Sequence, residues 1–388
     1  MKVLQINCVY GHGSTGVLVS QLHHYLQNRG WESLVCYGRG LNTTEAGVYR
    51  TAPEWYGKGN GLLARITGSP YGGSLAATEK LLRFIRKEKP DVVHLHCING
   101  NFVNVHRLVS FLKENRIPTV VTLHAEFLYT GNCSHALDCD GWKTGCGDCS
   151  RFSYDTGREY LRMAEAFCGF GSLLTVVSPS PWVRERAEAA PILQEGRHQT
   201  VFNGVDTAVF TEKSPQSSGE EKLIFHATAQ FRDDPDHLKG GWYVLELARR
   251  MNDCPVRFVV AGKYKISGEI PSNVTLLGQI HSPVQLAQWY RRGDLTLLTS
   301  RRETFSMVCA ESLCCGTPVV GFEAGGPESI ALQDCSRFVP WGDMEALESA
   351  VRENLSLQPD RTGISQRAEV VYGLEKMLQA YERIYLGG

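Results

Sequence analysis

The sequence has almost no excess charge of either sign. Its 388 residues include 40 Lys and Arg against 41 Asp and Glu, so the formal net charge is -1. Proteins that bind the phosphate backbone of nucleic acid carry a marked positive excess. The balance of charge therefore gives no support for nucleic acid as a partner.

Two kinds of apolar segment are also missing. No apolar run reaches the roughly 20 residues that a membrane-spanning helix needs. Residues 1–6 read as a short strand that leads into a glycine-rich loop, and not as an export signal. We therefore expect a cytoplasmic protein, in a reducing compartment where most of the 13 cysteines are free thiols in apolar segments.

The order of apolar and glycine-rich segments predicts an α/β protein with two domains. The chain opens with a strand, a glycine loop and a helix, and the same alternation restarts at Leu223. We expect a first domain over residues 1–205, a second over 206–370, and a helix over 371–388. Residues 40–74 have no clear period and are expected to form a long insertion.

The most informative stretch begins at Glu303. It follows a strand-like apolar run, and the pattern predicts a helix over 305–315 that Gly316 ends in a left-handed cap position. Glu303 then lies in the turn before this helix, and Glu311 lies about two turns inside it.

The start of this helix is a candidate anion site. The amides of Thr304, Phe305 and Ser306 fall at the expected N-terminus, where free N–H groups and the helix dipole attract a phosphate. Two carboxylates beside an anion site fit a ligand with a diphosphate between hydroxyl-bearing ends, as in a nucleotide sugar. Taken alone, glutamates at this spacing are more often solvated charges at a helix edge.

Two features of the first half also belong at ligand-facing strand ends. Gly11, Gly13 and Gly16 form a loose G-x-G-x-x-G loop, either a tight turn or a place where backbone approaches a ligand. His124 ends a predicted strand at the edge where α/β sheets bind ligands, and it can give or take a proton there. The alternative is a histidine bonded into the following loop.

The stretch from Glu303 to Ile330, which includes G-T-P-V-V and G-G-P-E-S-I, resembles the donor site of glycosyltransferase family four. The resemblance implies the GT-B fold: two facing Rossmann-like domains, a deep cleft between them, and a C-terminal helix that crosses back to complete the first domain. It also implies a retaining glycosyltransferase that moves a sugar from a UDP- or GDP-sugar to a hydroxyl of a glycan acceptor.

The resemblance further implies a role for each matching residue. The acceptor lies on the first domain and the donor on the second, and catalysis requires no cofactor. The implied donor-binding residues are Gly13, Arg232, Lys239, Glu303, Thr304, Phe305, Ser306 and Glu311, and the implied catalytic residues are His124, Glu303 and Lys239. Glu311 would bind the ribose, Glu303 the donor-sugar hydroxyls and Lys239 the leaving diphosphate.

The sequence departs from the family pattern at two of these places. Relatives carry Arg after a glycine at the strand end before Lys239, where this chain has Ala229 and Gln230, so Arg232 is the substitute. Relatives often carry Asp after the histidine that corresponds to His124, and here Ala125 follows.

Four cysteines follow His124 in a glycine-rich segment: Cys133, Cys139, Cys146 and Cys149. Four thiolates suit a tetrahedral zinc ion, but the spacing is irregular, so a structural zinc site and free thiols are both open, with disulfides third. A metal here would order the loop and take no part in catalysis. The segment resembles the colanic-acid and capsule branch of the family, which implies cell-surface polysaccharide biosynthesis.

Several alternatives remain at this stage. Asp234 and Asp236 form a D-x-D that binds a divalent metal in the single-domain GT-A transferases. A GT-B epimerase or phosphorylase, or a non-catalytic nucleotide-sugar-binding protein, would share the donor residues. The basic amphipathic stretch at 75–89 is either a surface helix or a peripheral contact with the inner face of a membrane, where lipid-linked glycan acceptors reside.

Overall fold

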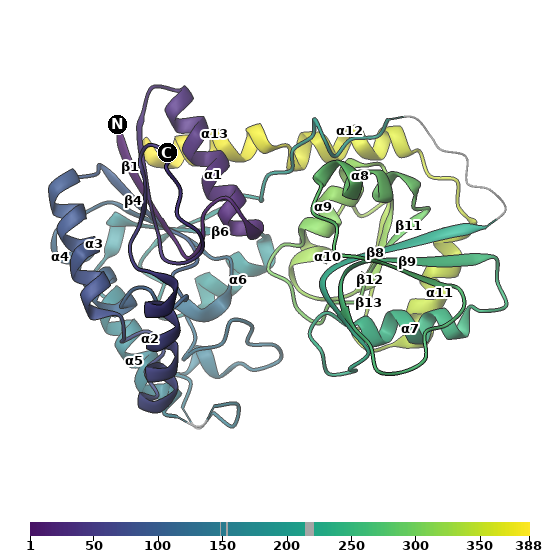
Figure 1. The fold of residues 1–388 in the computed structure, drawn as a ribbon, viewed down its shortest axis with the longest axis horizontal. Coiled ribbons are helices and arrows are strands. Elements are labelled where there is room, and N and C mark those ends of the chain that lie inside the picture. Colours follow the sequence, from purple (N-terminus) through teal and green to yellow (C-terminus); the bar gives the residue numbers. More distant parts are fainter. Residues whose placement is uncertain (148, 153, 214–220) are drawn as a thin grey trace. The chain divides into compact units, whose positions relative to one another are not determined.

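The computed structural model describes residues 1–147, 149–152, 154–213 and 221–388, and these divide into two compact units (Figure 1). Unit 1 comprises Met1–Val201 and Leu378–Gly388, and unit 2 comprises Phe202–Met377. Each unit has its own sheet and its own hydrophobic core.

Unit 1 is built on a seven-stranded parallel sheet in the order β3-β2-β1-β4-β5-β6-β7. Its strands are β1 (Lys2–Asn7), β2 (Glu32–Tyr37), β3 (Val48–Arg50), β4 (Val92–Leu95), β5 (Thr119–Thr122), β6 (Leu174–Ser178) and β7 (Arg197–Thr200). Its helices are α1 (Gly13–Asn28), α2 (Glu54–Thr67), α3 (Leu75–Glu88), α4 (Val105–Glu114), α5 (Thr156–Phe167), α6 (Pro181–Ala189) and the end of α13 (Leu374–Tyr385).

Helices cover both faces of this sheet, as expected for parallel strands whose residues are almost all buried. The larger core joins one face to α3, α4, α5 and α6. On the other face α1 packs on β1 and β2 (Figure 1). Tyr381 and Tyr385 of α13 contact His94 of β4.

Unit 2 repeats the plan with a six-stranded parallel sheet in the order β10-β9-β8-β11-β12-β13. Its strands are β8 (Lys222–Arg232), β9 (Val256–Lys265), β10 (Val274–Gly278), β11 (Leu295–Leu298), β12 (Val319–Phe322) and β13 (Ser336–Val339). Its helices are α7 (Gly241–Arg250), α8 (Pro283–Arg292), α9 (Met307–Cys314), α10 (Gly326–Ile330), α11 (Met344–Ser356) and α12 (Arg361–Tyr372).

Two separate cores hold the layers of unit 2 together. One joins a face of the sheet to α8, α9 and α12, and the other joins the opposite face to α7 and α11 (Figure 1). The expected two-domain α/β architecture is therefore confirmed, with a Rossmann-like sheet in each unit.

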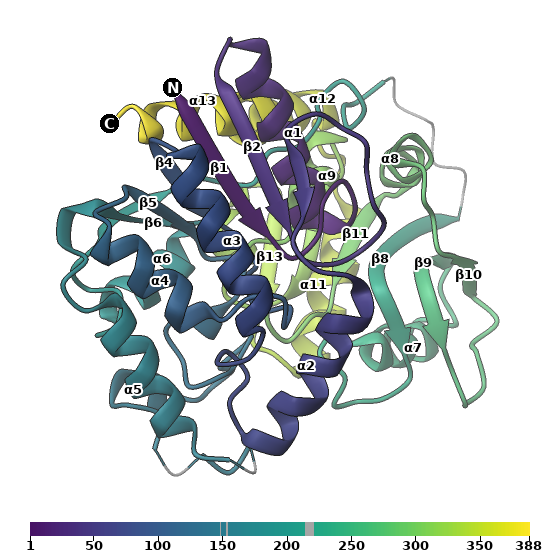
Figure 2. The same ribbon diagram turned by 60° about the vertical axis from the view of Figure 1, so that its left-hand side comes forward.

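Three expectations about local structure need correction. The stretch 40–74 is not a plain insertion, because it holds β3 and the whole of α2, which lies below strands β1 and β2 in the view of Figure 2. The helix expected over 371–388 begins at Leu374, after a break at Gly373 that separates it from α12. The predicted helix over 305–315 is shorter, since α9 spans Met307–Cys314.

Parallel pairing brings the sequence-predicted residues to common edges. β1, β4 and β5 are neighbours, so the glycine loop and His124 follow strands at one edge of the first sheet, and His96, which was not predicted, lies between them. β8, β11 and β12 are neighbours in unit 2, so Lys239, Glu303 and Gly325 follow adjacent strands at one edge of the second. Such carboxyl-terminal edges are where open α/β sheets bind ligands.

Candidate active site

An ion pair between Lys239 and Glu303 lies at the edge of the second sheet. The Lys239 Nζ is 2.6 Å from the Glu303 Oε1, and both side chains are partly exposed, at 30% and 21%. Lys239 comes from the loop after β8, and Glu303 comes from the loop after β11. Two residues that the sequence singled out, 64 positions apart, are thus brought into direct contact.

The backbone next to Lys239 requires glycine. Gly240 caps α7 with φ +64°, and a Cβ there would lie 1.9 Å from the carbonyl oxygen of Thr299. The Thr299 hydroxyl donates to the carbonyl of Lys239, and the Arg301 amide donates to the carbonyl of Leu238. The end of β11 therefore holds the loop that presents the lysine.

Glu303 is held by the loop after β12. Its amide donates to the carbonyl of Ala324 at 3.0 Å, and its carbonyl accepts from the Gly326 amide at 2.9 Å. The Glu328 carboxylate accepts from the amides of Ala324 and Gly325, which fixes that loop at the start of α10. In the G-G-P-E-S-I motif, the glycines and Glu328 thus support Glu303.

The start of α9 differs from the prediction. Thr304, Phe305 and Ser306 precede the helix, so their amides are not its first-turn amides, and the Phe305 side chain is buried in the core of unit 2. Ser306 is the N-cap, with its hydroxyl accepting from the Cys309 amide at 3.3 Å. The first helical amides are those of Met307 and Val308, and these are the donors that an anion at this helix end would meet.

Glu311 lies inside α9 as predicted. The buried Tyr290 hydroxyl, from α8, donates to the Glu311 Oε2 at 3.1 Å. Burial disfavours the charged carboxylate and raises the pKa of Glu311 to about 7, although the Tyr290 hydrogen bond opposes the shift. Gly316 ends the helix at φ +75°, so the predicted left-handed cap is confirmed.

The remaining predicted residues of unit 2 lie near the loop after β8. The Arg232 guanidinium donates to the Gln230 side chain at 2.9 Å, in place of a direct contact with Lys239 or Glu303. Asp234 accepts from the amide of Asp236, so it shapes a turn. The single-domain alternative that needed Asp234 and Asp236 for a metal is contradicted by the two-sheet fold.

In unit 1, His124 belongs to a cluster of three histidines. Its Nε2 is 3.2 Å from the Nδ1 of His96, and the two rings are stacked at 5.5 Å. The His94 ring packs on that of His96 with centroids 3.8 Å apart and an interplanar angle of 35°. Burial lowers the pKa of His124 to about 4, so the imidazole is neutral at working pH.

The glycine loop of unit 1 has an open side. Gly11 and Gly13 have φ +70° and +65°, and a Cβ added at either would meet no described atom within 4 Å. The Gly11 amide donates to the carbonyl of Gly16 at 3.0 Å, which closes the turn. The loop combines the features of a tight turn with backbone that a ligand can approach, so the role predicted for Gly13 stays a prediction.

The four cysteines after His124 line a single cavity of about 210 Å³. Three of the sulfurs accept from nearby N–H groups: Cys146 from Gly131, Cys139 from Gly141, and Cys133 from Arg151. All 13 cysteines, each among the described residues, are free thiols. Across the described part of the chain no three His, Cys, Asp or Glu side chains are close enough to hold a metal, so the zinc site stays a prediction.

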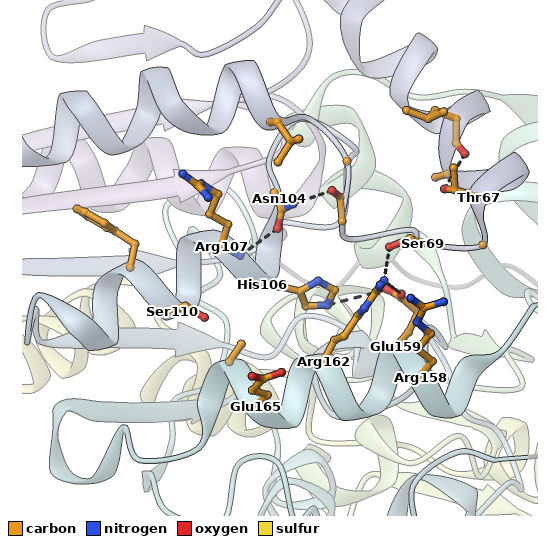
Figure 3. A pocket seen from close by; sticks show the side chains of 18 of the residues that line it. Thr67, Ser69, Asn104, His106, Arg107, Ser110, Arg158, Glu159, Arg162 and Glu165 are labelled. Atoms are coloured by element: carbon orange, nitrogen blue, oxygen red, sulfur yellow. Dashed lines mark hydrogen bonds and ion pairs between the residues drawn. The ribbon is translucent and has the colours of Figure 1, made fainter.

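A larger cavity of about 970 Å³ lies in the helical layer of unit 1 (Figure 3). Arg162 crosses it from α5, donating to the Ser69 hydroxyl at 3.1 Å and pairing with Glu159 at 2.7 Å. His106 lies 4.0 Å from Glu159, and burial lowers its pKa to about 4. The polar side chains that line this cavity link α4 and α5 to the loop before α3 by hydrogen bonds. The described residues that line the cavity include none of the site residues predicted from the sequence.

Sequence reasoning missed three residues that contact the predicted site. Tyr290 supports Glu311, and His94 and His96 accompany His124. The signal for the histidines was present, because H-L-H at the end of β4 places both side chains on one face of a strand next to the strand that ends before His124. Tyr290 gave no such signal, since its partner depends on the packing of α8 against α9.

In comparisons with known proteins, each half of the chain matches a glycosyltransferase family model. Residues 15–209 match the family model described as Glycosyltransferase Family 4, and residues 229–356 match the one described as Glycosyl transferases group 1. The chain is 23% identical over 414 residues to WcaC of Escherichia coli strain K12, assigned to colanic acid biosynthesis as a glycosyl transferase, with 99% of each chain covered.

Solved structures agree over the whole length. Sucrose-phosphate synthase from Thermosynechococcus elongatus aligns with a TM-score of 0.69 at 14% identity and covers 100% of both chains. HepE of Anabaena, solved in complex with UDP and glucose, aligns with a TM-score of 0.63 at 16% identity and covers 99% of both. At these identities the likeness shows the fold.

Proposed function

The chain belongs to glycosyltransferase family 4, with the GT-B fold, and from this membership we propose its reaction. It transfers a sugar from a UDP- or GDP-sugar to a hydroxyl of a glycan acceptor, with retention of anomeric configuration, in the biosynthesis of a cell-surface polysaccharide. The colanic-acid assignment of WcaC supports the pathway, and the UDP and glucose bound by Anabaena HepE support the donor class.

The observation that carries the proposal is the Lys239–Glu303 pair beside the N-terminus of α9, with Glu311 farther along that helix. A cation, first-turn amides and two carboxylates are the groups that a nucleotide sugar needs. The lysine and the amides suit the diphosphate, one carboxylate suits the ribose hydroxyls, and the other suits the sugar.

The ion pair gives Lys239 and Glu303 linked roles. Before donor binds, each neutralises the other at 2.6 Å. We propose that the incoming diphosphate takes over Lys239 and frees the Glu303 carboxylate to accept from hydroxyls of the donor sugar. The bond between the anomeric carbon and the diphosphate oxygen then breaks with its electron pair going to that oxygen, the acceptor oxygen bonds to the carbon, and the acceptor hydroxyl passes its proton to the released diphosphate.

In this proposal the growing negative charge on the diphosphate is stabilised by Lys239 and by the amides of Met307 and Val308, so catalysis requires no metal. A screen of UDP- and GDP-sugars for thermal stabilisation and for release of free nucleotide, with and without EDTA, tests it. We expect one donor to stabilise the protein and to be cleaved at a rate that EDTA leaves unchanged. Loss of cleavage in EDTA and recovery with manganese would contradict the proposal.

The acceptor is proposed to be a lipid-linked glycan reached by peripheral membrane contact. Every helix in the described part of the chain is too short or too polar to span a bilayer. The apolar face of α3, the helix within the stretch 75–89, packs into the core of unit 1, so these apolar side chains do not supply the contact. The exposed apolar side chains of α2, which include Trp55 and Ile66, are the proposed surface, and equal sedimentation with anionic and neutral vesicles would count against it.

A further inference from the structure

The histidine cluster of unit 1 has a fixed chain of hydrogen bonds that begins at Gln5 in β1. Gln5 and His96 are 0% and 1% exposed, so their polar groups depend on each other and not on bulk water. The Gln5 Nε2 lies 3.4 Å from the carbonyl oxygen of Val19, and only the amide nitrogen can donate to a carbonyl. The Gln5 Oε1 therefore faces the Nε2 of His96, at 3.2 Å.

This orientation decides which nitrogen of His96 carries a proton. The Gln5 Oε1 only accepts, so the Nε2 of His96 must donate to it. Burial lowers the pKa of His96 well below its usual value, so the ring is neutral and carries a single N–H. The Nδ1 of His96 is then a hydrogen-bond acceptor.

The same reasoning identifies the protonated nitrogen of His124. Its Nε2 lies 3.2 Å from the acceptor Nδ1 of His96, so the Nε2 of His124 is the donor. His124 is neutral as well, which leaves its Nδ1 with the lone pair. The direction of every bond in the chain from Gln5 to His124 is thus set by the carbonyl of Val19.

We propose that His96 is a positioning residue that holds His124 in the neutral tautomer protonated on Nε2. The consequence of this tautomer for catalysis rests on the proposed function, whereas the tautomer itself is a property of the free protein.

The packing around His96 keeps this arrangement from reversing by rotation of the ring. The His94 ring lies against the His96 ring, with centroids 3.8 Å apart and an interplanar angle of 35°. His94 is itself fixed at both nitrogens, with the Nδ1 2.6 Å from the Tyr385 hydroxyl and the Nε2 2.8 Å from the Thr122 hydroxyl. The Tyr381 hydroxyl lies 2.9 Å from that of Thr122. The His94 ring is therefore anchored by residues of β5 and α13.

The tautomer can be tested without any substrate. Histidine labelled with ¹⁵N in the full-length protein reports by long-range ¹H–¹⁵N correlation which ring nitrogen carries the proton, and a His124→Gln variant identifies the His124 signals. We expect a protonated Nε2 and an unprotonated Nδ1, with a Nε2 proton slow enough in exchange to be observed. His96→Phe should abolish that proton signal, and His94→Phe, from the same strand, should keep it.

Once His124→Gln has identified the His124 signals, the result for the wild-type protein is decisive, even where His96→Phe or His94→Phe does not fold. A proton on Nδ1 of His124, or a second proton on His96, would overturn the proposal. Persistence of the Nε2 proton signal in folded His96→Phe would overturn it as well.

Kinetics separates a positioning role from a structural one. With the donor found by nucleotide release, we expect His96→Phe to lower kcat on the order of tenfold and to leave the donor KM unchanged. The double variant with His124→Ala should be no slower than His124→Ala alone, because His96 acts through His124. Additive losses would contradict this role, and a protein that cleaves no donor would refute the proposed function while leaving the tautomer measurement intact.

Discussion

At the scale of single residues, Glu311 shows how a ligand-binding carboxylate is prepared. Its neighbour in the free protein is the Tyr290 hydroxyl, a neutral donor that cannot offset the loss of water around a charge. The pKa is accordingly raised to about 7. Two ribose hydroxyls would add two donors to the charged form, so donor binding should favour the ionised carboxylate.

This predicts a pH dependence of donor binding. Below about pH 7 Glu311 is protonated in the free protein and can no longer accept from both ribose hydroxyls, so the donor KM should rise about tenfold per pH unit. Above pH 7 the KM should be constant. Glu311→Gln should give a high KM that does not vary over the same range, and a flat wild-type profile from about pH 5.5 to 8 would contradict the assignment.

The same shift affects stability with a defined sign. The folded pKa lies above the ordinary value of 4.5, so the folded state holds this proton more tightly than the unfolded chain does. The contribution to stability is fully present below about pH 4.5 and is lost as the pH rises through about 7. Glu311→Gln should remove this part of the slope in the free energy of unfolding, as measured by urea titration at several pH values.

At the scale of elements, the two sheets were predictable because their strands are short apolar runs between helices and glycine-rich turns. The errors have local causes. Three glycines, at 57, 59 and 61, obscure the helical pattern of α2 in the sequence, because glycine disfavours a helix. The backbone of Ser306 at φ +85° delays the start of α9 beyond Phe305. The contacts of Glu311 and His124 depend on neighbouring helices and strands, which no single segment reveals.

In the loop between β8 and α7, the addition of one methyl group should have a large effect on stability and on donor affinity. Gly240→Ala must adopt φ +64° and place its Cβ 1.9 Å from the Thr299 carbonyl oxygen, so the loop carrying Lys239 has to move. We expect a loss of about 3 kcal/mol in the free energy of unfolding of unit 2 and a weaker donor affinity.

Gly278→Ala is the matched control for this loop. Gly278 also has a positive φ, at +74°, but a Cβ there meets no described atom within 4 Å. Only the backbone strain should appear, about 1 kcal/mol, with donor affinity unchanged. Equal effects of the two substitutions in urea unfolding and donor binding would show that the contact with Thr299 does not position the loop.

The cysteine loop makes a separate prediction about metal. Four thiols around one cavity, with N–H donors to three of the sulfurs, have the chemistry of a zinc site. A structural zinc site predicts about one zinc per chain after purification under reducing conditions without chelator, and a lower melting temperature when Cys133 and Cys146 are replaced by Ser. Zinc near zero in metal analysis would remove the site and leave four free thiols.

At the scale of the whole molecule, the second start of the α/β pattern at Leu223 indicates a second Rossmann-like sheet, and the structure contains it. Each half of the chain matches its own glycosyltransferase model. The predicted break at 205/206 compares with an observed division after Val201. The composition of the sequence does not predict that residues 378–388 belong to unit 1. Their position there depends on the packing of Tyr381 and Tyr385 against His94.

The central claim is that the edge of the second sheet binds the nucleotide sugar, with Lys239 on the diphosphate and Glu311 on the ribose. The most direct measurement is calorimetric binding of the nucleoside diphosphate released from the preferred donor, and of the matching nucleoside. Lys239→Ala should weaken the diphosphate at least tenfold and leave the nucleoside unchanged, whereas Glu311→Ala should weaken both.

Lys263, an exposed lysine near the end of β9, supplies the control for charge alone. The account predicts wild-type affinity for Lys263→Ala with both ligands. If Lys239→Ala and Lys263→Ala bind the nucleoside diphosphate equally well, the diphosphate does not lie at Lys239 and the central claim is wrong.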